Sequence, residues 1–305
     1  MPNILLIFID GLGLGRNDAL VNPCAKAKAD ILGNFFDPTT STITRNNGPL
    51  PFGGFIVGVD ASLGVKGLPQ SGTGQTALLT GMNAAEIAGR HVPAFPTKRL
   101  KEVIYEHSLF KTLVKLGKNV ALLNAYRPAF FELGEKIWEK RLSVSTLANH
   151  AAGLPFFTFD HVARGEALHH EFTNALLREA RFDLPFYTPS QAGKIVAQRS
   201  EAFDFLMFEY FQTDFAGHSR EMGRGVEEIE KLDDFLTSLL SSIDLTSTLV
   251  ILASDHGNIE DLSVKTHTLN RAMTICWGEG AEEVASRLKT LTDLAPAVVE
   301  YLSEK

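Results

Sequence analysis

Short runs of apolar residues alternate with stretches of helical periodicity along most of the chain. Residues 3–9 (NILLIFI) are apolar on both faces, which is typical of a fully buried strand in a parallel sheet. Comparable runs predict further strands near 55–59 and at 119–124, 202–210, 247–253 and 271–277.

Helices are predicted between these strands. The glycine-bearing segment 67–81 leads into a helix near Thr76, and 109–116 and 282–291 have helical patterns. A longer helix carries apolar residues on one face, with acids at its start, where the helix dipole favours them. Strands that alternate with helices predict an α/β fold, a doubly wound and mostly parallel sheet with helices on both faces. The apolar positions of the longer helix are Val226, Ile229, Leu232, Leu236, Leu239 and Ile243.

The pattern weakens between residues 126 and 189, where phenylalanines cluster and prolines interrupt the periodicity. We interpret 126–189 as a small inserted lid or decoration on a core formed by 1–125 and 190–305. A structural insertion or a contact between subunits explains the same features. The histidines of this segment are expected to be solvated, because no carboxylate spacing supports a metal site. They are His150, His161, His169 and His170.

The composition is that of an ordinary globular protein of 305 residues, with 45% hydrophobic and 21% charged residues. A net charge of −7 argues against general affinity for nucleic acid or an anionic membrane, although bound metal ions would still attract a small phosphorylated substrate. Cys24 and Cys276 lack CxxC spacing, and no segment approaches the roughly 20 apolar residues that cross a bilayer. We expect a reduced, cytoplasmic protein, and the oligomeric state stays open.

Metal-competent side chains follow three of the predicted strands. Ligands of open α/β sheets bind beyond the carboxyl ends of the strands, so these side chains are expected to converge. Ser71 precedes a helix whose free N–H groups could cradle a phosphate. The strand-end residues are Asp10, Asp214 and His218 in TDFAGH, Asp255 and His256 in SDHGN, and His267 in KTHT.

This mixture of carboxylates and imidazoles suits zinc or manganese better than calcium. Seven candidate ligands, counting Ser71, exceed the needs of one ion and predict a two-metal site, in which a serine oxygen can act as the nucleophile. Each piece also has an ordinary explanation. Asp10 could cap a turn, and His218 and His267 could be polar surface residues. Their joint placement at strand ends favours the metal site.

Several segments resemble the alkaline phosphatase superfamily, within it the branch of cofactor-independent phosphoglycerate mutase and phosphopentomutase. They are IFIDGLG (7–13), QSGTGQTALLTG (70–81), TDFAGH (213–218), ASDHGNIED with KTHT (253–268), and the closing TLTDLAPAVVEYL. The resemblance covers both ends of the chain but not the middle. It implies an alkaline-phosphatase-like core with two divalent ions. One ion would be bound by Asp214, His218 and His267, and the other by Asp10, Asp255, His256 and the Ser71 oxygen.

The resemblance also implies that Ser71 is the nucleophile. Gly74 follows Ser71 by three residues, as a glycine follows the nucleophile of the two mutases. Thr73 is the alternative, either as a phosphate-contacting hydroxyl or as the nucleophile itself. Position 75 departs from those mutases, which have a histidine where this chain has Gln75.

Other residues near these segments are candidates for supporting roles. Arg90, His91 and Arg127 could contact a substrate phosphate, although such residues more often make surface contacts. Asn258 could orient a metal ligand by a hydrogen bond.

The sequence thus predicts a phosphate-ester hydrolase with a phosphoserine intermediate, and a phosphomutase is the alternative. The segment 126–189 is too short for the large cap of the phosphoglycerate mutase, which favours hydrolysis. A sulfatase is disfavoured because the context of Ser71 lacks the required proline and arginine. A dinucleotide-binding loop after the first strand would need a glycine where the chain has Arg16. A metal-stabilised protein without activity is the remaining possibility.

Overall fold

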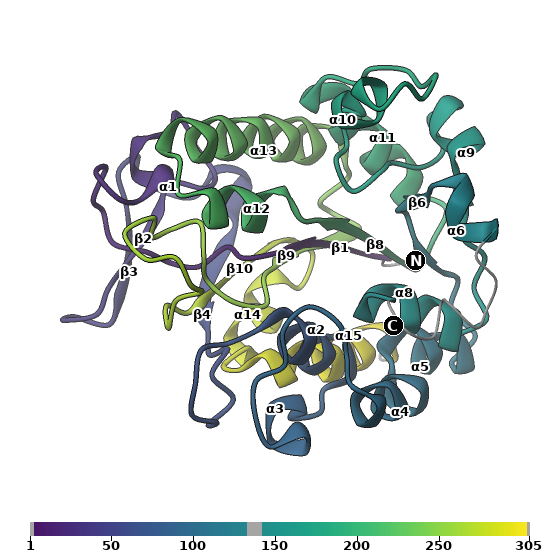
Figure 1. The fold of residues 1–305 in the computed structure, drawn as a ribbon, viewed down its shortest axis with the longest axis horizontal. Helices are drawn as coiled ribbons and strands as arrows, with labels where there is room; N and C mark the ends of the chain where they lie inside the picture. Colours follow the sequence, from purple (N-terminus) through teal and green to yellow (C-terminus); the bar gives the residue numbers. More distant parts are fainter. Residues whose placement is uncertain (1–2, 133–141, 304–305) are drawn as a thin grey trace.

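A mostly parallel sheet forms the centre of the protein in the computed structural model, which describes residues 3–132 and 142–303 (Figure 1). Within these ranges six strands pair in the order β4-β10-β9-β1-β8-β5. They are β1 (Asn3–Ile9), β4 (Phe55–Val59), β5 (Val120–Leu122), β8 (Phe205–Tyr210), β9 (Thr248–Ala253) and β10 (Ala272–Gly278).

Strand β1 lies between two parallel neighbours, because it is apolar on both faces and can be buried on both. In the register of the sheet, Ile9 pairs with Tyr210 of β8, and Phe8 pairs with Ala253 of β9. Strand β5 is parallel to β8, whereas β10 runs antiparallel to both β9 and β4. The carboxyl ends of β1, β8 and β9 therefore meet at one edge of the sheet.

Helices cover both faces of the sheet (Figure 1). The side chains of β1 alternate between two hydrophobic clusters, with Phe8 in one and Ile7 in the other. The cluster of Phe8 includes residues of α2 (Ser71–Thr80), α3 (Ala84–Ala88), α4 (Lys98–His107), α5 (Leu109–Lys115), α8 (Val144–Ala151), α14 (Ala281–Arg287) and α15 (Leu294–Ser303). The cluster of Ile7 includes residues of α1 (Pro23–Lys26), α9 (Phe159–Ala163), α10 (Ala175–Glu179), α11 (Pro189–Ser200), α12 (Gln212–Ser219) and α13 (Met222–Ser242).

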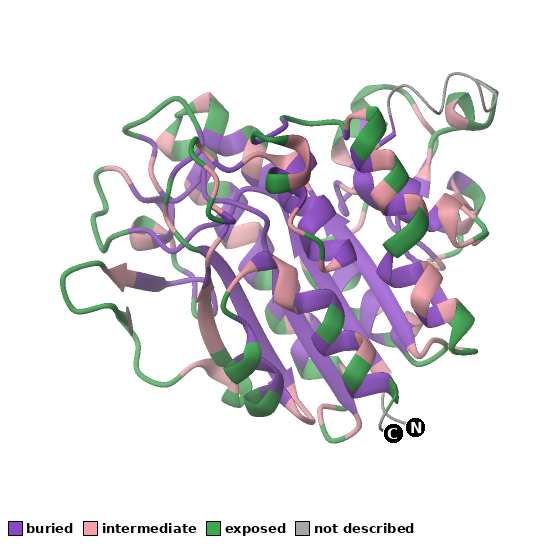
Figure 2. Ribbon diagram, turned by 90° about the horizontal axis from the view of Figure 1, so that it is seen from below, coloured by how far each residue is buried: buried purple, intermediate pink, exposed green. Residues whose placement is uncertain are grey.

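This arrangement confirms the predicted doubly wound α/β fold, and Figure 2 shows the buried strands running through its middle. The helix expected over 282–291 is shorter than predicted. Helix α14 ends at Arg287, and a separate 3-10 turn, Leu291–Asp293, follows, capped by Thr290. A hairpin of β2 (Asn34–Asp37) and β3 (Thr42–Arg45) lies beside the main sheet. None of the helices in the described ranges is both long and apolar enough to cross a membrane.

The segment expected as an insertion contributes to both faces of the core. It includes α6 (Pro128–Glu132), α8, β7 (Phe157–Thr158), α9 and α10, and β7 pairs with β6 (Ala125–Tyr126). Leu147 of α8 lies in one hydrophobic cluster and Val162 of α9 in the other. Residues 133–141 of this segment lie outside the described ranges. The division into a core and an inserted lid stays a prediction.

Candidate metal centre

The candidate metal ligands come together at the carboxyl edge of the sheet. Asp10 directly follows β1, Asp255 and His256 follow β9, and α12 after β8 carries Asp214. Their ligand atoms form two groups of three, in each of which all the atoms lie within 4.8 Å of one another. The groups are Asp10, Asp255 and His256, and Asp214, His256 and His267.

The first group surrounds the ring of His256, which is completely buried. Its Nε2 atom lies 3.4 Å from Oδ1 of Asp10 and 3.5 Å from Oδ2 of Asp255. The hydroxyl of Ser71, the first residue of α2, lies 3.0 Å from the same Nε2. The candidate nucleophile and three candidate ligands thus share one small volume.

The second group is centred on Asp214. Nε2 of His218 lies 3.3 Å from Oδ2 of Asp214, and Nε2 of His267 lies 3.5 Å from Oδ1. The two imidazole nitrogens are 3.3 Å apart. Asp214 and His218 share one face of α12 because they are four residues apart. His218 therefore lies beside Asp214 and His267.

Hydrogen bonding fixes the tautomer of His267. Its Nδ1 lies 2.8 Å from the backbone carbonyl of Pro69, which can only accept, so Nδ1 carries the proton. Nε2 then presents a lone pair towards Asp214, as a metal ligand must. The ring of His267 stacks on that of His256 with 3.8 Å between centroids, which places the two groups side by side.

The electrostatics of the first group fit a bound cation. Burial raises the pKa of Asp10, and the charges of Asp255, Asp214 and Glu209 raise it further. Burial also raises the pKa of Asp255, and it lowers the pKa of His256. Oδ1 of Asp10 is buried without a hydrogen-bond partner in the described structure. A divalent cation would supply the charge and the partner that these groups lack, and it would bind His256 in its neutral form.

Helix α2 is positioned against this group by Gly74 and Gln75. A Cβ atom on Gly74 would lie 2.8 Å from the carbonyl oxygen of Asp255, so only glycine lets the helix approach this closely. Nε2 of Gln75 lies 3.3 Å from Oδ2 of Asp10 and 3.3 Å from Oδ2 of Asp255. The residue that departs from the two mutases thus bridges the two carboxylates.

Asn258 contacts a candidate ligand, since its Nδ2 lies 2.6 Å from Oδ1 of Asp214. The sequence analysis missed Glu260, which is almost fully buried behind the site. Its Oε2 accepts hydrogen bonds from the backbone N–H of Gly13 at 3.0 Å and of Asn258 at 2.7 Å. Its Oε1 accepts one from the Thr268 hydroxyl at 2.5 Å. The sequence offered one signal for the role of Glu260, because this residue lies two positions after Asn258, in the same segment as Asp255.

Two of the candidate substrate-binding residues form hydrogen bonds to backbone atoms. The Thr73 hydroxyl donates to the carbonyl of Gln70 at 3.1 Å and accepts from the N–H of Val92 at 3.2 Å. Nε2 of the buried His91 lies 3.1 Å from the carbonyl of Val65. These hydrogen bonds do not favour Thr73 as the nucleophile.

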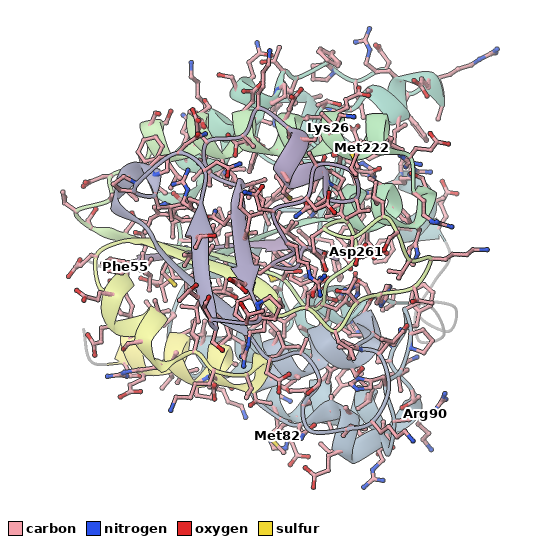
Figure 3. All side chains as sticks on the ribbon, turned by 90° about the vertical axis from the view of Figure 1, so that its left-hand side faces the viewer. Lys26, Phe55, Met82, Arg90, Met222 and Asp261 are labelled. Carbon is pink, nitrogen blue, oxygen red and sulfur yellow. The ribbon has the colours of Figure 1, made fainter. Side chains whose placement is uncertain are left out.

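The two arginines do not lie at the cavity beside Ser71 either. Arg90 is exposed and lies at the edge of the molecule, away from Asp261 (Figure 3). Arg127 lines a different cavity. The cavity beside Ser71 has a volume of about 350 Å³ and includes Lys265, a cation that the sequence analysis did not single out. Its other described lining residues are Leu68, Gln70, Pro93, Ala94, Asp214, His218, Thr266 and His267.

The expectation that His169 and His170 are solvated is wrong. His169 is only 4% exposed and His170 is half-buried, because both pack among the aromatic side chains beside β6 and α12.

Comparison with known proteins agrees with the fold. Residues 190–305 match the model of the Metalloenzyme superfamily. The 2,3-bisphosphoglycerate-independent phosphoglycerate mutase of Haloquadratum walsbyi is 31% identical over 108 residues, which are 33% of this chain and 21% of that protein. The corresponding mutase of Paracoccus denitrificans is 26% identical over 140 residues, 43% of this chain and 27% of that protein. The matches thus span about a fifth to a quarter of the length of these relatives.

Solved structures resemble the whole chain. A protein from Pyrococcus horikoshii superposes with a TM-score of 0.59 at 14% identity, covering 100% of this chain and 97% of its own. Alkaline phosphatase from the Antarctic bacterium TAB5 superposes with a TM-score of 0.54 at 14% identity, covering 100% and 99%. At these identities the likeness shows the fold. The chain therefore has an alkaline-phosphatase-like fold, its residues 190–305 match the Metalloenzyme superfamily, and part of its length resembles phosphoglycerate mutases.

Proposed function

We propose that the protein is a two-metal phosphoryl-transfer hydrolase that acts on small phosphate esters through a phosphoserine at Ser71. The observation that carries this proposal is the 3.0 Å contact between the Ser71 hydroxyl and Nε2 of His256, a residue that belongs to both groups of candidate ligands. The donor set of carboxylates and imidazoles supports manganese or zinc.

Six side chains and the Ser71 oxygen would hold two ions. Asp214, His218 and His267 would bind one, and Asp10, Asp255 and His256 would bind the other together with the Ser71 oxygen. Divalent ions in such a pair lower the pKa of a bound hydroxyl or water and stabilise negative charge on the transferring phosphoryl group.

The chain itself supplies the nucleophile and a positive environment for the phosphate. Ser71 and Gly72 are the first residues of α2, and the first N–H groups of a helix have no partner within the helix. Lys265 adds a cation to the same cavity. The Ser71 oxygen forms a bond to phosphorus as the bond from phosphorus to the ester oxygen breaks. Water then cleaves the phosphoserine, releases phosphate and restores the hydroxyl.

The experiment is a panel of phosphomonoesters and phosphodiesters, assayed with manganese or zinc for the wild type and Ser71→Ala. We expect the substitution to lower kcat by about three orders of magnitude or more, because it removes the atom that accepts the phosphoryl group. Thr73→Ala serves as the matched control and keeps most of the activity. Unchanged turnover by Ser71→Ala would show that this mechanism is wrong.

A phosphomutase is the second candidate, because the curated relatives that match the chain are phosphoglycerate mutases. A mutase would return the phosphoryl group from Ser71 to its substrate instead of to water. Incubation with phosphoglycerates and phosphosugars distinguishes the two. Hydrolysis releases free phosphate, whereas a mutase accumulates the isomeric ester without it.

A further inference from the structure

A second cavity lies at the carboxyl ends of β5 and β8, beside β6, α6 and α8. Its volume is about 390 Å³, and it shares none of its described lining residues with the cavity beside Ser71. Aromatic side chains dominate its wall, which is typical of cavities that bind small molecules. They are Tyr126, Phe130, His169, His170 and Phe211.

Glu209 of β8 is the acidic residue of this cavity and is only 3% exposed. Its backbone is fixed by Asn124, whose amide accepts from the Glu209 N–H at 2.9 Å and donates to the Glu209 carbonyl at 2.8 Å. Its Oε2 accepts a hydrogen bond from the Ser145 hydroxyl at 2.6 Å. Its Oε1 is buried without a hydrogen-bond partner in the described structure. Buried polar atoms are nearly always paired, so this oxygen points to a missing donor.

A chain of hydroxyl groups holds the carboxyl group of Glu209 in place. The Ser145 hydroxyl lies 3.0 Å from that of Ser143, which lies 2.7 Å from that of Thr146. The Tyr126 hydroxyl lies 2.8 Å from that of Thr146. These hydroxyls therefore bond to one another, and Oε1 of Glu209 is the acceptor that the network leaves for a ligand.

The histidines of the cavity act as uncharged aromatic rings at neutral pH. Burial, helped by the charges of His170 and Arg127, lowers the pKa of His169 to about 2, and burial helped by Arg127 lowers the pKa of His170 to about 4. The two rings lie 4.0 Å apart between centroids, and His170 lies 5.5 Å from the ring of Phe211. Flat neutral rings of this kind stack on any nucleobase, because every base has a planar π-face.

We propose that this cavity binds a nucleoside or nucleotide whose base carries an exocyclic amino group. Above its pKa of about 7 the Glu209 carboxyl group is ionised and can only accept hydrogen bonds, so the amine donates to its Oε1. The base stacks on the aromatic wall, which a sugar without a planar ring cannot do equally well. The exposed Arg127 lies on the lining of the same cavity, where it pairs with a phosphate of the ligand. The inference does not depend on phosphoryl transfer at Ser71.

The experiment is isothermal titration of the full chain with matched pairs of nucleosides, at a pH above the pKa of Glu209. Adenosine is compared with purine riboside, which lacks only the amino group, and cytidine is compared with its 4-deamino analogue. We expect the amino-bearing member of at least one pair to bind about 10- to 100-fold more tightly, the effect of one hydrogen bond to a charged group. Absence of binding by every nucleoside at millimolar concentration would overturn the proposal.

Variants assign the preference to Glu209. Glu209→Met removes the acceptor and is expected to abolish the preference for the amino group, whereas Glu209→Gln keeps a neutral acceptor and is expected to weaken it. Circular dichroism confirms that the variants are folded. Glu201→Gln, an exposed glutamate after α11, is the matched control and keeps the preference. A preference that survives undiminished in the folded Glu209 variants contradicts the proposal.

A last comparison separates this cavity from the metal centre. In protein treated with chelator, adenosine monophosphate is expected to bind more tightly than adenosine, and Arg127→Ala is expected to remove the difference. Loss of all nucleoside binding on chelation would instead place the ligand at the metal centre and overturn the proposal.

Discussion

Asp10, Asp255 and His256 are buried, and burial favours the uncharged form of each. Two ionised carboxylates beside a neutral imidazole form a stable arrangement there only if something supplies positive charge. Around them, residues without a charge of their own fix the geometry. Gln75 bridges the two carboxylates.

Glu260 is expected to position the loops that carry the ligands. Glu260→Ala leaves the N–H groups of Gly13 and Asn258 and the Thr268 hydroxyl without their acceptor, so metal affinity should fall about 10- to 100-fold. Glu260→Gln keeps part of the network and should recover part of the affinity. Titration with manganese measures both, and Glu282→Gln, at an exposed position, is the control. Wild-type affinity in Glu260→Ala would contradict this role.

Glu209 should make the stability of the metal-free protein depend on pH. Burial raises its pKa from 4.5 to about 7, so the folded protein keeps a proton that the unfolded chain loses. The stability that the neutral side chain contributes is thus present at low pH and is lost as pH rises through this window. The free energy of unfolding of Glu209→Gln should rise by about 3 kcal/mol relative to the wild type between pH 4.5 and 7. Urea unfolding in chelator tests this, and a difference that is constant with pH would refute it.

Helix α2 packs closely against the carboxyl edge of the sheet, because Gly74 lies against the backbone of Asp255. Its first residue, Ser71, is placed beside His256 by this contact. Helix α12 places Asp214 and His218 by its four-residue spacing alone.

Gly74→Ala should therefore lower both activity and stability, the latter by about 1–3 kcal/mol, because the new methyl group pushes α2 away from Asp255. Gly223→Ala in α13 is the matched control. A Cβ at Gly223 meets no atom within 4 Å, and alanine there should stabilise the protein by up to about 1 kcal/mol. Thermal unfolding and ester hydrolysis measure the two effects. Equal behaviour of the two variants would show that the close approach of α2 is unimportant.

The strands could be predicted from the sequence because both faces of a central parallel strand are buried and the apolar runs are continuous. The residues at the strand ends were predicted for the same reason, since Asp10 and Asp255 end such runs. Glu260 and Lys265 were missed because their neighbours depend on how the loops after β9 fold back, which has no periodic pattern. His169 was misjudged because its burial depends on packing against distant elements.

In the whole molecule, helices cover both faces of the sheet (Figure 1). Both cavities lie at the carboxyl edge of this sheet. Residues from nearly every part of the chain, from Asp10 to His267, meet there. Folding of the whole chain is thus required to build the metal centre, and binding of metal should in turn stabilise the whole fold.

Chelation should therefore lower the melting temperature, by about 5 °C or more for ions bound at a hundred times their Kd. Asp255→Asn should show a smaller change on chelation, because one of the two groups has lost a ligand. Differential scanning calorimetry with manganese and with chelator provides the measurement. Identical melting curves in the two conditions would contradict a structural role for the ions.

The most direct test of the central claim is a crystal structure grown with manganese, with anomalous scattering recorded at the manganese edge. The account predicts two anomalous peaks, one among Asp214, His218 and His267 and the other among Asp10, Asp255, His256 and the Ser71 hydroxyl. A map without peaks between these side chains, at saturating manganese, would contradict it.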